Sequence, residues 1–460
     1  MGLVSRLLSL ALAVSSSAFA ASIAVVDSGV DYKHQDLATH MWVNEANPVQ
    51  TVDVDGTKYV DDLHGWNFAE QNNEVIDYKY LGTFSPDCTK IFLVQTKVLK
   101  GTATSEEKAW YKSKKEDQEF LKELGKFGNF VHGTHVSGIA TRDAESSRVV
   151  AMKLIPTEQG GLINDARAFL AKHKKAVAED PGEDLTSGES NPLVELFLTL
   201  LAQRQAQMLE VVGKYVAATH SHVANGSFGA SVNAVIPVIK QVLKQLLGRD
   251  PSDEETKTYS IFFVNAMVKA METFPGAAKD TLFVFAAGND GTDNDVLPAA
   301  PANIKADNVI SVAASLDFAS LATFSNYGAT SVDVAAPGVA ILSSIPGDDH
   351  LPMSGTSMAT PYVTRVGGVV KDANPTLNPA GIKQIIVGTV DVKPFLKGKV
   401  SSGGIVNIAR AVRAGELSKE MSITAAIQKA IKEVKDTRAM ILPPARLDQD
   451  LLVLPLPSMF

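Results

Sequence analysis

The chain has almost no cysteine, since Cys88 is the only one among 460 residues. An intrachain disulfide is therefore excluded, and stability must come from a packed core or from bound ions. Cys88 itself is expected to be a free, buried thiol. Aromatic residues make up 7% and charged residues 20%, but 45% are hydrophobic, which is enough apolar material for one large domain with insertions or for two domains.

The excess of one sign of charge over the other is also small. The formal net charge is −8, and such mild acidity favours solubility and does not provide a basic surface for nucleic acid. Beyond the N-terminal region, no segment is apolar for the length of a membrane span without charges or prolines, so no stable span is expected. We therefore expect neither a nucleic-acid partner nor a membrane-embedded protein, and we expect a monomer.

The N-terminus has the layout of a secretory signal. Arg6 precedes an apolar run from Leu7 to Val14, and small residues follow up to Ala18-Phe19-Ala20, which is an A-x-A cleavage pattern. Residues 1–20 are therefore expected to be a signal peptide for export to the cell exterior or the periplasm. The alternative is an uncleaved N-terminal helix, which would be too short to span a bilayer comfortably.

Short apolar, β-branched segments alternate with helical patterns along much of the chain. This rhythm predicts an α/β fold with a buried, mostly parallel sheet, and such sheets place functional groups at the carboxyl ends of their strands. Asp27 ends the first segment, and Asn289 lies just beyond the third. The segments are Ser22 to Asp27, Val149 to Leu154, Thr281 to Ala286, Val309 to Ala313 and Val332 to Ala335.

Two stretches interrupt this rhythm within the expected domain of residues 21–415. Residues from about 80 to 130 are rich in lysine and glutamate, and they predict a solvated surface insertion with a capping box at Thr104 and Glu107. Residues from about 157 to 218 form a second insertion, where Asn191 and Pro192 predict the start of a long helix. Residues 416–460 are expected to form a C-terminal helix and a Pro- and Leu-rich tail.

The most informative motif is Gly355-Thr356-Ser357, which is followed by a helical pattern. It predicts that Ser357 lies in the first turn of a helix, where unpaired N–H groups would meet an oxyanion. Taken alone, the motif also fits a simple Ser/Thr helix cap. Acyl transfer by a serine additionally needs a base, a group that orients the base, and donors for the oxyanion.

Three other motifs offer a candidate for each of these roles. Asp27 closes a buried strand, where a carboxylate must be hydrogen-bonded and is suited to holding an imidazole. His132 begins the motif HGTHVSGIA ahead of an expected helix, and Asn289 stands in a Gly-Asn-Asp-Gly turn from which its amide could face an oxyanion. His135 raises the alternative of a zinc pair with His132, but no third ligand motif accompanies them, so a structural role is expected for His135.

With these motifs in the order Asp, His, Asn, Ser, the chain resembles the subtilisin-like serine peptidases. The matching motifs are AVVDSGVD, HGTHVSGIA, FVFAAGNDG and MSGTSMATPYV, and the likeness covers most of residues 22–414 outside the insertions. The resemblance implies a three-layer α/β/α fold and a serine endopeptidase that acts on proteins or peptides. It implies that Asp27 orients His132, which is the general base and then acid. Ser357 would attack, and Asn289 with the Ser357 N–H would bind the oxyanion.

The resemblance also implies two sets of substrate-binding residues. Three residues would pair with the substrate backbone, and three would line a P1 pocket with mainly apolar walls. Pairing through the main chain reads shape more than sequence, so broad specificity with an apolar or aromatic P1 preference is expected. The two sets are Ser227, Phe228 and Gly229, and Ala286, Ala287 and Gly288.

The chain also departs from the family pattern. The family usually has a propeptide between the signal and the catalytic domain, yet the first predicted strand begins almost at the expected cleavage site. The chain is therefore expected to fold unaided or with help from another segment, and the amphipathic C-terminal segment is expected to pack on the domain surface. No cofactor is required, although the spacing of Asp53, Asp55 and Asp62 resembles a structural calcium site, with a solvated acidic turn as the alternative.

Two other functions stay open at this point. A subtilisin-like scaffold that has become a binding protein would usually have lost a catalytic residue, and none is lost here. Ester hydrolysis is open to the same site chemistry, but no lipase-type G-x-S-x-G elbow surrounds Ser357.

Overall fold

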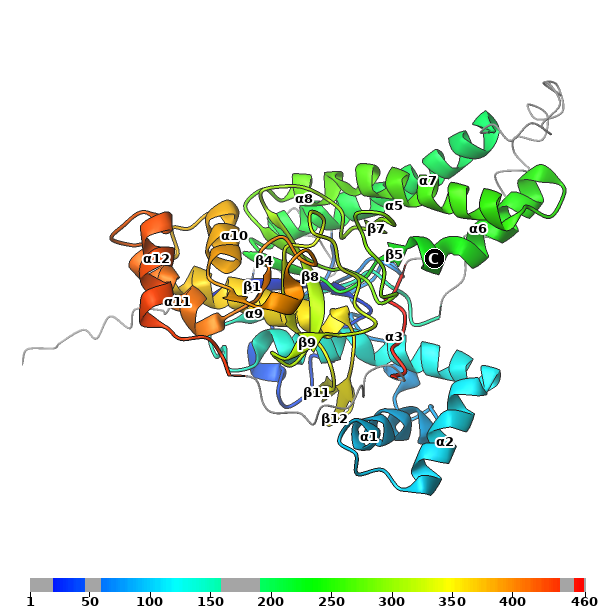
Figure 1. Cartoon of the computed structure of the whole chain (residues 1–460), viewed down its shortest axis with the longest axis horizontal. Coiled ribbons are helices and arrows are strands. Elements are labelled where there is room, and N and C mark those ends of the chain that lie inside the picture. Colours follow the sequence, from blue (N-terminus) through cyan, green and yellow to red (C-terminus); the bar gives the residue numbers. More distant parts are fainter. Residues whose placement is uncertain (1–19, 46–58, 159–190, 439–450, 459–460) are drawn as a thin grey trace, which may run out of the picture.

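The computed structural model describes residues 20–45, 59–158, 191–438 and 451–458 (Figure 1). Nearly all of the expected signal peptide lies outside these residues, as do residues 159–190 of the second insertion. Among the described residues, no helix is long and apolar enough to cross a membrane.

A ten-stranded sheet forms the centre, with the path β13-β14-β10-β8-β6-β4-β1-β3-β2 and β9 paired to β8. Among the described strands of this sheet, only the β13–β14 and β8–β9 pairs are antiparallel. The predicted α/β fold with a mostly parallel sheet is confirmed. The strands are β1 (Ser22–Asp27), β2 (Gly65–Asn67), β3 (Arg148–Lys153), β4 (Val223–Gly226), β6 (Leu282–Ala286), β8 (Val309–Leu316), β9 (Ser320–Leu321), β10 (Val334–Pro337), β13 (Asp391–Val392) and β14 (Gly404–Ile405).

Alternating side chains on the strands fill a core on each face of the sheet, which gives three layers (Figure 1). On β6, Phe283 and Phe285 join one core, whereas Leu282 and Val284 join the other. The first core contains α5 (Pro192–Ala218), α6 (Val232–Leu247), α7 (Asp253–Met271) and α8 (Thr273–Ala277), and the second contains α9 (Thr356–Ala373), α10 (Pro379–Gly388), α11 (Ile408–Leu417) and α12 (Ile423–Glu433).

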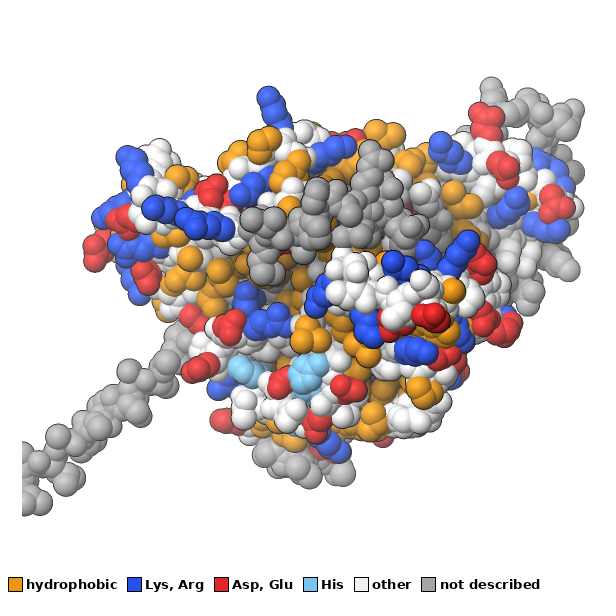
Figure 2. Space-filling view, turned by 60° about the horizontal axis from the view of Figure 1, so that its bottom comes forward, with side chains coloured by type: hydrophobic (Ala, Val, Ile, Leu, Met, Phe, Trp, Pro, Cys, Tyr) orange, Lys and Arg blue, Asp and Glu red, His pale blue; other side chains and the backbone are white. Residues whose placement is uncertain are grey.

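The first insertion is packed on one side, so the prediction of a solvated surface insertion was incomplete. It forms α1 (Asp87–Leu99), α2 (Ser105–Glu116) and the start of α3 (Gln118–Thr141). Cys88, Tyr111 and Phe120 are buried there against the hairpin of β11 (Ile341–Ile345) and β12 (Asp349–Met353). The capping box at Thr104 and Glu107 is present. On the face shown in Figure 2, basic side chains are interspersed with acidic ones.

The predicted start of a long helix at Asn191 and Pro192 is also confirmed. Asn191 accepts the Val194 N–H at 3.3 Å at the start of α5, and α6 ends at Gly248, which adopts a left-handed φ of 67°. The remaining short elements are β5 (Ala230–Ser231), β7 (Ala299–Ala300), η1 (Ala38–His40), η2 (Tyr78–Tyr80) and η3 (Pro394–Leu396).

Candidate active site

Asp27 and His132 form a buried carboxylate–imidazole pair. Asp27 is the last residue of β1, and its Oδ1 lies 2.7 Å from His132 Nδ1. The same oxygen accepts the Ser28 N–H at 2.7 Å, so the chain's own backbone holds the carboxylate. An imidazole that donates its Nδ1–H to a buried carboxylate presents Nε2 as a base.

Close approach at Gly133 brings the histidine helix to β1. A Cβ on Gly133 would lie 2.2 Å from the Gly29 carbonyl oxygen, so only glycine lets α3 pack this tightly. The Gly133 N–H also donates to the Ser28 hydroxyl at 3.3 Å. These contacts set the position of His132 relative to Asp27.

The histidine helix is longer than the sequence predicted. The motif at His132 indicates a helix that begins there, but α3 begins at Gln118 and runs for 24 residues. Asp117 caps it by accepting the Phe120 N–H at 3.1 Å. The charge-rich composition of this stretch is typical of exposed surface. For that reason the sequence did not show that the end of the insertion and the residues around His132 form one helix.

Ser357 is the second residue of α9, as the motif predicts. Its hydroxyl donates to the Ser227 carbonyl at 3.2 Å, and within the described chain no hydrogen bond joins it to His132. Pro361 lies in the second turn of α9, and it has no N–H to give the Ser357 carbonyl. The Ser227 hydroxyl replaces that donor at 2.9 Å, so two hydrogen bonds tie Ser227 to Ser357.

Asn289 lies in the loop after β6, and its amide has a fixed orientation. Its Oδ1 accepts the Thr356 N–H at 2.9 Å and the Thr356 hydroxyl at 2.8 Å. Because a backbone N–H can only donate, this contact assigns the amide oxygen, and the Nδ2 donors point the other way. Nδ2 donates to the carbonyl oxygen of Leu454 at 3.0 Å.

Residues 451–458, hereafter the tail, therefore lie across this site. In Figure 1 the red tail passes α3 and ends near β5, and the Gly229 N–H donates to the Pro457 carbonyl at 3.0 Å. A cavity of about 360 Å³ is lined by His132 together with tail residues 454–457.

The predicted substrate-binding residues lie around the same place. Ser227, Phe228 and Gly229 connect β4 to β5, with the Phe228 side chain buried in the core and the Gly229 N–H turned to the tail. Ala286 ends β6, and Ala287 and Gly288 follow it. Gly288 has a φ of +121°, and a Cβ there would lie 2.3 Å from Asn326 Nδ2, so this wall of the site requires glycine.

His135 is directed away from the candidate catalytic group. It is buried, and its Nε2 lies 2.8 Å from the Leu351 carbonyl on β12. Burial lowers the pKa of His135 to about 3, which keeps the ring neutral. The described residues contain no metal-ligating group that includes His132 and His135.

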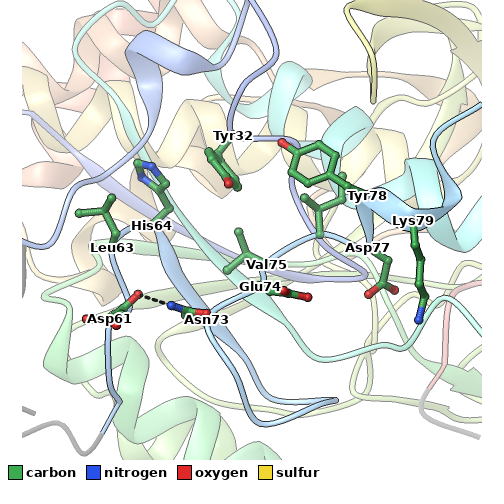
Figure 3. A pocket seen from close by; sticks show the side chains of 11 residues that line it. Tyr32, Asp61, Leu63, His64, Asn73, Glu74, Val75, Asp77, Tyr78 and Lys79 are labelled. Carbon is green, nitrogen blue, oxygen red and sulfur yellow. Dashed lines mark hydrogen bonds between the residues drawn. The ribbon is translucent and has the colours of Figure 1, made fainter. Parts of the chain in front are cut away.

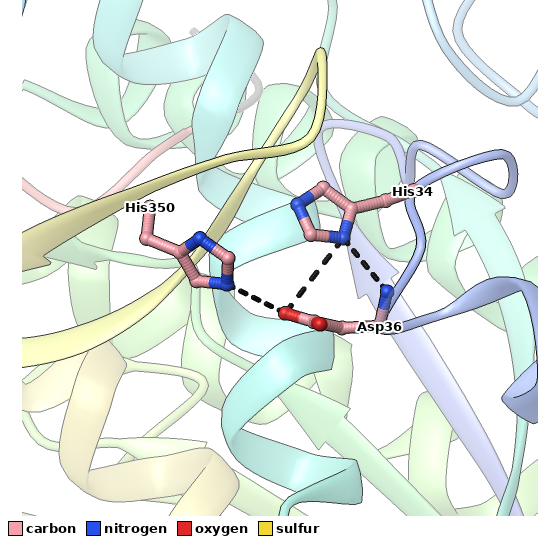
Figure 4. A group of neighbouring side chains, drawn as sticks. All are labelled: His34, Asp36 and His350. Atoms are coloured by element: carbon pink, nitrogen blue, oxygen red, sulfur yellow. Dashed lines mark hydrogen bonds and ion pairs between the residues drawn. The ribbon is translucent and has the colours of Figure 1, made fainter.

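One group of described side chains does bring three metal-type ligand atoms together, namely His34, Asp36 and His350, within 4.8 Å of one another (Figure 4). Asp36 Oδ2 lies 2.6 Å from His350 Nε2 and accepts the Ser344 hydroxyl at 2.7 Å, while His34 Nδ1 accepts the Asp36 N–H at 3.1 Å. Burial would raise the pKa of Asp36, but hydrogen bonds from Ser344 and His350 outweigh it, so the pKa is lowered. These contacts connect the loop after β1 to the β11–β12 hairpin.

The predicted calcium residues lie mostly outside the described chain, because Asp53 and Asp55 belong to residues 46–58. Asp62 is buried, its Oδ1 accepts from Asn44 Nδ2 at 2.8 Å and its Oδ2 accepts the Tyr215 hydroxyl at 2.6 Å. Both carboxylate oxygens therefore have protein donors, which favours a structural role for Asp62 over direct coordination of an ion.

A larger cavity, of about 590 Å³, is lined by Tyr32, Asp61, Leu63, His64 and residues 73–79 (Figure 3). At its rim the Tyr78 hydroxyl donates to Asp31 Oδ1 at 2.6 Å. None of the four candidate catalytic residues lines it, so this cavity is separate from the acyl-transfer chemistry.

Three residues that hold the site were not evident from the sequence. Thr356 orients Asn289, as described above. Asn225 Nδ2 donates to the Ser227 hydroxyl at 2.9 Å, and the Thr364 hydroxyl donates to Asn225 Oδ1 at 3.0 Å. Thr356 stands beside Ser357 and could have been suspected, but Asn225 and Thr364 are 139 residues apart, and no local pattern connects β4 to α9.

The chain belongs to the Subtilase family, whose model matches residues 20–420 and so includes all four candidate residues. It is 26% identical over 399 residues to Subtilisin-like protease 1 of Plasmodium vivax, which covers 85% of this chain and 46% of that protein. It is 38% identical over 145 residues to an extracellular protease of Xanthomonas campestris pv. campestris, which covers 30% of this chain and 24% of that protein.

A solved structure of a cold-adapted subtilisin-like serine proteinase is 18% identical to this chain, with a TM-score of 0.42 over 85% of this chain and 88% of that one. The chain spans about half or less of the length of the two curated relatives named above.

Proposed function

We propose that this chain is a serine endopeptidase that hydrolyses peptide bonds through an acyl-enzyme intermediate. The observation that carries the proposal is a peptide carbonyl bound by the candidate oxyanion donor, because Asn289 Nδ2 donates to Leu454 O at 3.0 Å. This contact lies beside the α9 turn that carries Ser357. A donor fixed in advance and directed at a peptide carbonyl is what acyl transfer requires. Membership of the Subtilase family supports the same reaction.

In the proposed reaction, Ser357 attacks the substrate carbonyl carbon while His132 Nε2 accepts the hydroxyl proton. Asp27 holds the ring through the 2.7 Å contact at Nδ1 and stabilises the imidazolium. The carbonyl oxygen becomes an oxyanion, to which Asn289 Nδ2 and the Ser357 N–H donate. The imidazolium protonates the leaving amine, and a water molecule then repeats the sequence on the acyl-enzyme. To begin, the Ser357 hydroxyl must turn from the Ser227 carbonyl to His132.

The proposal includes broad specificity with an apolar P1 preference. The pocket wall at Ala286, Ala287 and Gly288 carries no charged side chain, and the N–H of Gly229, which donates to a peptide carbonyl of the tail, is suited to pairing with any peptide backbone. We expect kcat/KM for Leu or Phe at P1 to exceed that for Asp at P1 by about 10-fold or more, measured on matched fluorogenic peptides. Equal kcat/KM values for these peptides would contradict the proposed P1 preference, but they would not contradict the proposed acyl-transfer reaction.

Export and a monomeric state also belong to the proposal. Export is supported by the signal pattern in residues 1–20 and by the name of the extracellular relative from Xanthomonas campestris. N-terminal sequencing of protein from the culture medium or periplasm, with a start at Ala21, tests the first. Light scattering on the same sample tests the second. The four-residue acyl-transfer chemistry requires no cofactor.

The experiment that tests the reaction compares purified wild type with Ser357→Ala. Both are treated with a fluorophosphonate probe and assayed on casein and on a simple ester. We expect the wild type to be labelled and to cleave casein, and both signals to vanish in the variant. Labelling with ester cleavage but without casein cleavage would assign an esterase. Serine catalysis would be refuted if neither the folded wild type nor a folded variant with residues 451–458 displaced from the site is ever labelled.

A further inference from the structure

We propose that the tail is an intramolecular inhibitor, which occupies the active cleft in the direction opposite to that of a substrate and keeps the folded chain latent. The inference rests on the proposed function, because it assigns a regulator to that same site. The tail has the sequence Leu-Leu-Val-Leu-Pro-Leu-Pro-Ser.

The tail is anchored through its backbone at three points along its length. The first lies on the α1–α2 insertion, the second at the candidate oxyanion donor, and the third on the segment expected to bind substrate, so the tail crosses the whole site. The bonds join Leu452 N–H to Gln95 Oε1 (2.7 Å) and the Tyr111 hydroxyl (2.8 Å), Asn289 Nδ2 to Leu454 O (3.0 Å), and Gly229 N–H to Pro457 O (3.0 Å).

The anchor on the insertion consists of two buried polar side chains. Gln95 is 3% exposed and Tyr111 is 5% exposed, and the Tyr111 hydroxyl donates to Gln95 Oε1 at 2.5 Å. Burying polar groups is costly unless they are hydrogen-bonded. Both face the Leu452 N–H, so part of their hydrogen bonding is completed by the tail.

The apolar side chains of the tail fit the surface beside the histidine. Leu452 and Leu454 pack against the core formed by α1, α2, α3 and the hairpin, and Pro457 is buried. Leu454 lies against a bare stretch of α3, since a Cβ on Gly128 would be 2.5 Å from Leu454 Cδ1. The tail therefore combines side-chain packing with backbone pairing.

The direction of the tail explains why it would inhibit rather than be cleaved. We take Gly229 to pair, in a substrate complex, with a residue that precedes the attacked carbonyl. Here Gly229 pairs with Pro457, three residues after Leu454, whose carbonyl is at the oxyanion donor. The tail thus runs backwards, so the amide nitrogen of Pro455 lies on the acyl side and not where His132 would protonate a leaving amine. That nitrogen also carries a ring carbon in place of a hydrogen.

Ser357 and His132 are almost inaccessible to solvent while the tail is bound. With the tail in place, Ser357 is 3% exposed and His132 is 4% exposed, and the Ser357 hydroxyl is turned to the Ser227 carbonyl. A peptide substrate would need both Asn289 and Gly229, and the tail uses both. Tail release must therefore precede substrate binding, and its equilibrium sets the apparent activity.

The main test is Leu454→Asp in the full chain, with Leu196→Asp as the control, since Leu196 is a 54% exposed leucine on α5. The carboxylate would face the apolar surface beside Gly128 and expel the tail. We expect Leu454→Asp to raise the initial rate on a fluorogenic peptide, and the rate of fluorophosphonate labelling, by on the order of 10-fold or more. Leu196→Asp should match the wild type.

A second pair of variants avoids a new charge. Gly128→Ala places a Cβ against Leu454, whereas Gly125→Ala on the same helix meets nothing within 4 Å. Both substitutions favour helix formation equally. We expect activation for Gly128→Ala only. If Leu454→Asp fails to fold, this pair decides the question.

The octapeptide LLVLPLPS tests the same contacts in trans. Added to Leu454→Asp at about millimolar concentration, comparable to a tethered segment, it should raise KM without lowering kcat. Mass spectrometry should find both the peptide and the full chain uncut between Leu454 and Pro455. Cleavage at that bond would show substrate-like binding and overturn the reversed direction.

The outcomes separate this proposal from the proposed function. If wild type, Leu454→Asp and Gly128→Ala are all labelled and hydrolyse peptide at the same rate, the tail is no inhibitor, although serine catalysis stands. If all are folded by circular dichroism and none is labelled, the proposed function itself fails. Activation of both tail variants with competitive inhibition by the octapeptide supports latency.

Discussion

Replacement of Asn289 by alanine should slow catalysis strongly while leaving the fold intact. The structure fixes the amide through Thr356 and directs Nδ2 at a peptide carbonyl 3.0 Å away. Loss of one such donor costs about 10²–10³ in kcat, or about 2.7–4 kcal/mol, a figure that comes from subtilisin itself. KM should change little, because the donor acts on the oxyanion more than on the bound substrate.

Because of the tail, the loss of activity measured for Asn289→Ala should differ between the wild-type chain and the Leu454→Asp variant. Asn289 also donates to Leu454 O, and a neutral hydrogen bond contributes about 0.5–1.5 kcal/mol. Asn289→Ala would therefore loosen the tail about 2–10-fold and partly offset the catalytic loss in the otherwise wild-type chain. In the Leu454→Asp background, where the tail is already displaced, the full factor of about 10²–10³ should appear.

The assay is steady-state hydrolysis of a fluorogenic peptide, with active sites counted by fluorophosphonate titration. Asn73→Ala, which removes an exposed amide bonded to the Asp61 carbonyl, is the matched control and should retain wild-type kcat. Thr356→Val keeps the N–H but loses the 2.8 Å hydroxyl contact, so its kcat should fall about 2–10-fold. If kcat of Asn289→Ala stays within about threefold of its parent in both backgrounds, Asn289 is not the oxyanion donor.

Three further predictions concern stability and reactivity. Lys153 is fully buried, and its Nζ lies 2.6 Å from Glu70 and 3.5 Å from Asp77. Lys153→Met should therefore lower the free energy of unfolding, measured in urea, by about 3 kcal/mol. A loss below about 1 kcal/mol would contradict this. The pKa of His135 in the folded protein is about 3, below the unfolded value of about 6.5, so protonation of His135 favours the unfolded state. The free energy of unfolding should therefore fall by about 1.4 kcal/mol per pH unit as the pH drops from the unfolded to the folded pKa. His135→Gln should remove that slope, and an unchanged slope would exclude His135 as its source. Burial raises the pKa of Cys88 to about 12, so Ellman's reagent at pH 8 should react only after denaturation, and prompt reaction of the native protein would contradict the buried position.

The sheet and most helix boundaries could be predicted because their signals are local. A β-branched run such as Ser22 to Asp27 reports a buried strand directly, and it became β1 with the same bounds. The end of α6 at Gly248 was equally readable, since glycine adopts left-handed φ without strain. For the candidate site, the motifs at Asp27, His132, Asn289 and Ser357 identified residues that the fold brings to one end of the sheet.

The supporting contacts could not be predicted because they join segments distant in the chain. Asn225 and Thr364 fix Ser227 through bonds between β4 and α9, and polar residues in buried positions carry no periodic signal. The N-terminal extension of α3 was missed for another reason. Lysine and glutamate between residues 100 and 125 indicate solvent exposure, and they say nothing of the face that buries Phe120 and Leu124.

The position of the tail in the candidate site could not be predicted from the sequence, for a physical reason that also bears on its role. Two of its three anchor points are backbone carbonyls, of Leu454 and Pro457, and every residue type has a carbonyl. Its two prolines exclude a regular helix, so no periodicity could show which face is buried. An extended segment read through its backbone is also what a peptidase site of broad specificity binds. The same chemistry therefore serves a substrate and an inhibitor, and the direction of the chain across Asn289 and Gly229 distinguishes the two.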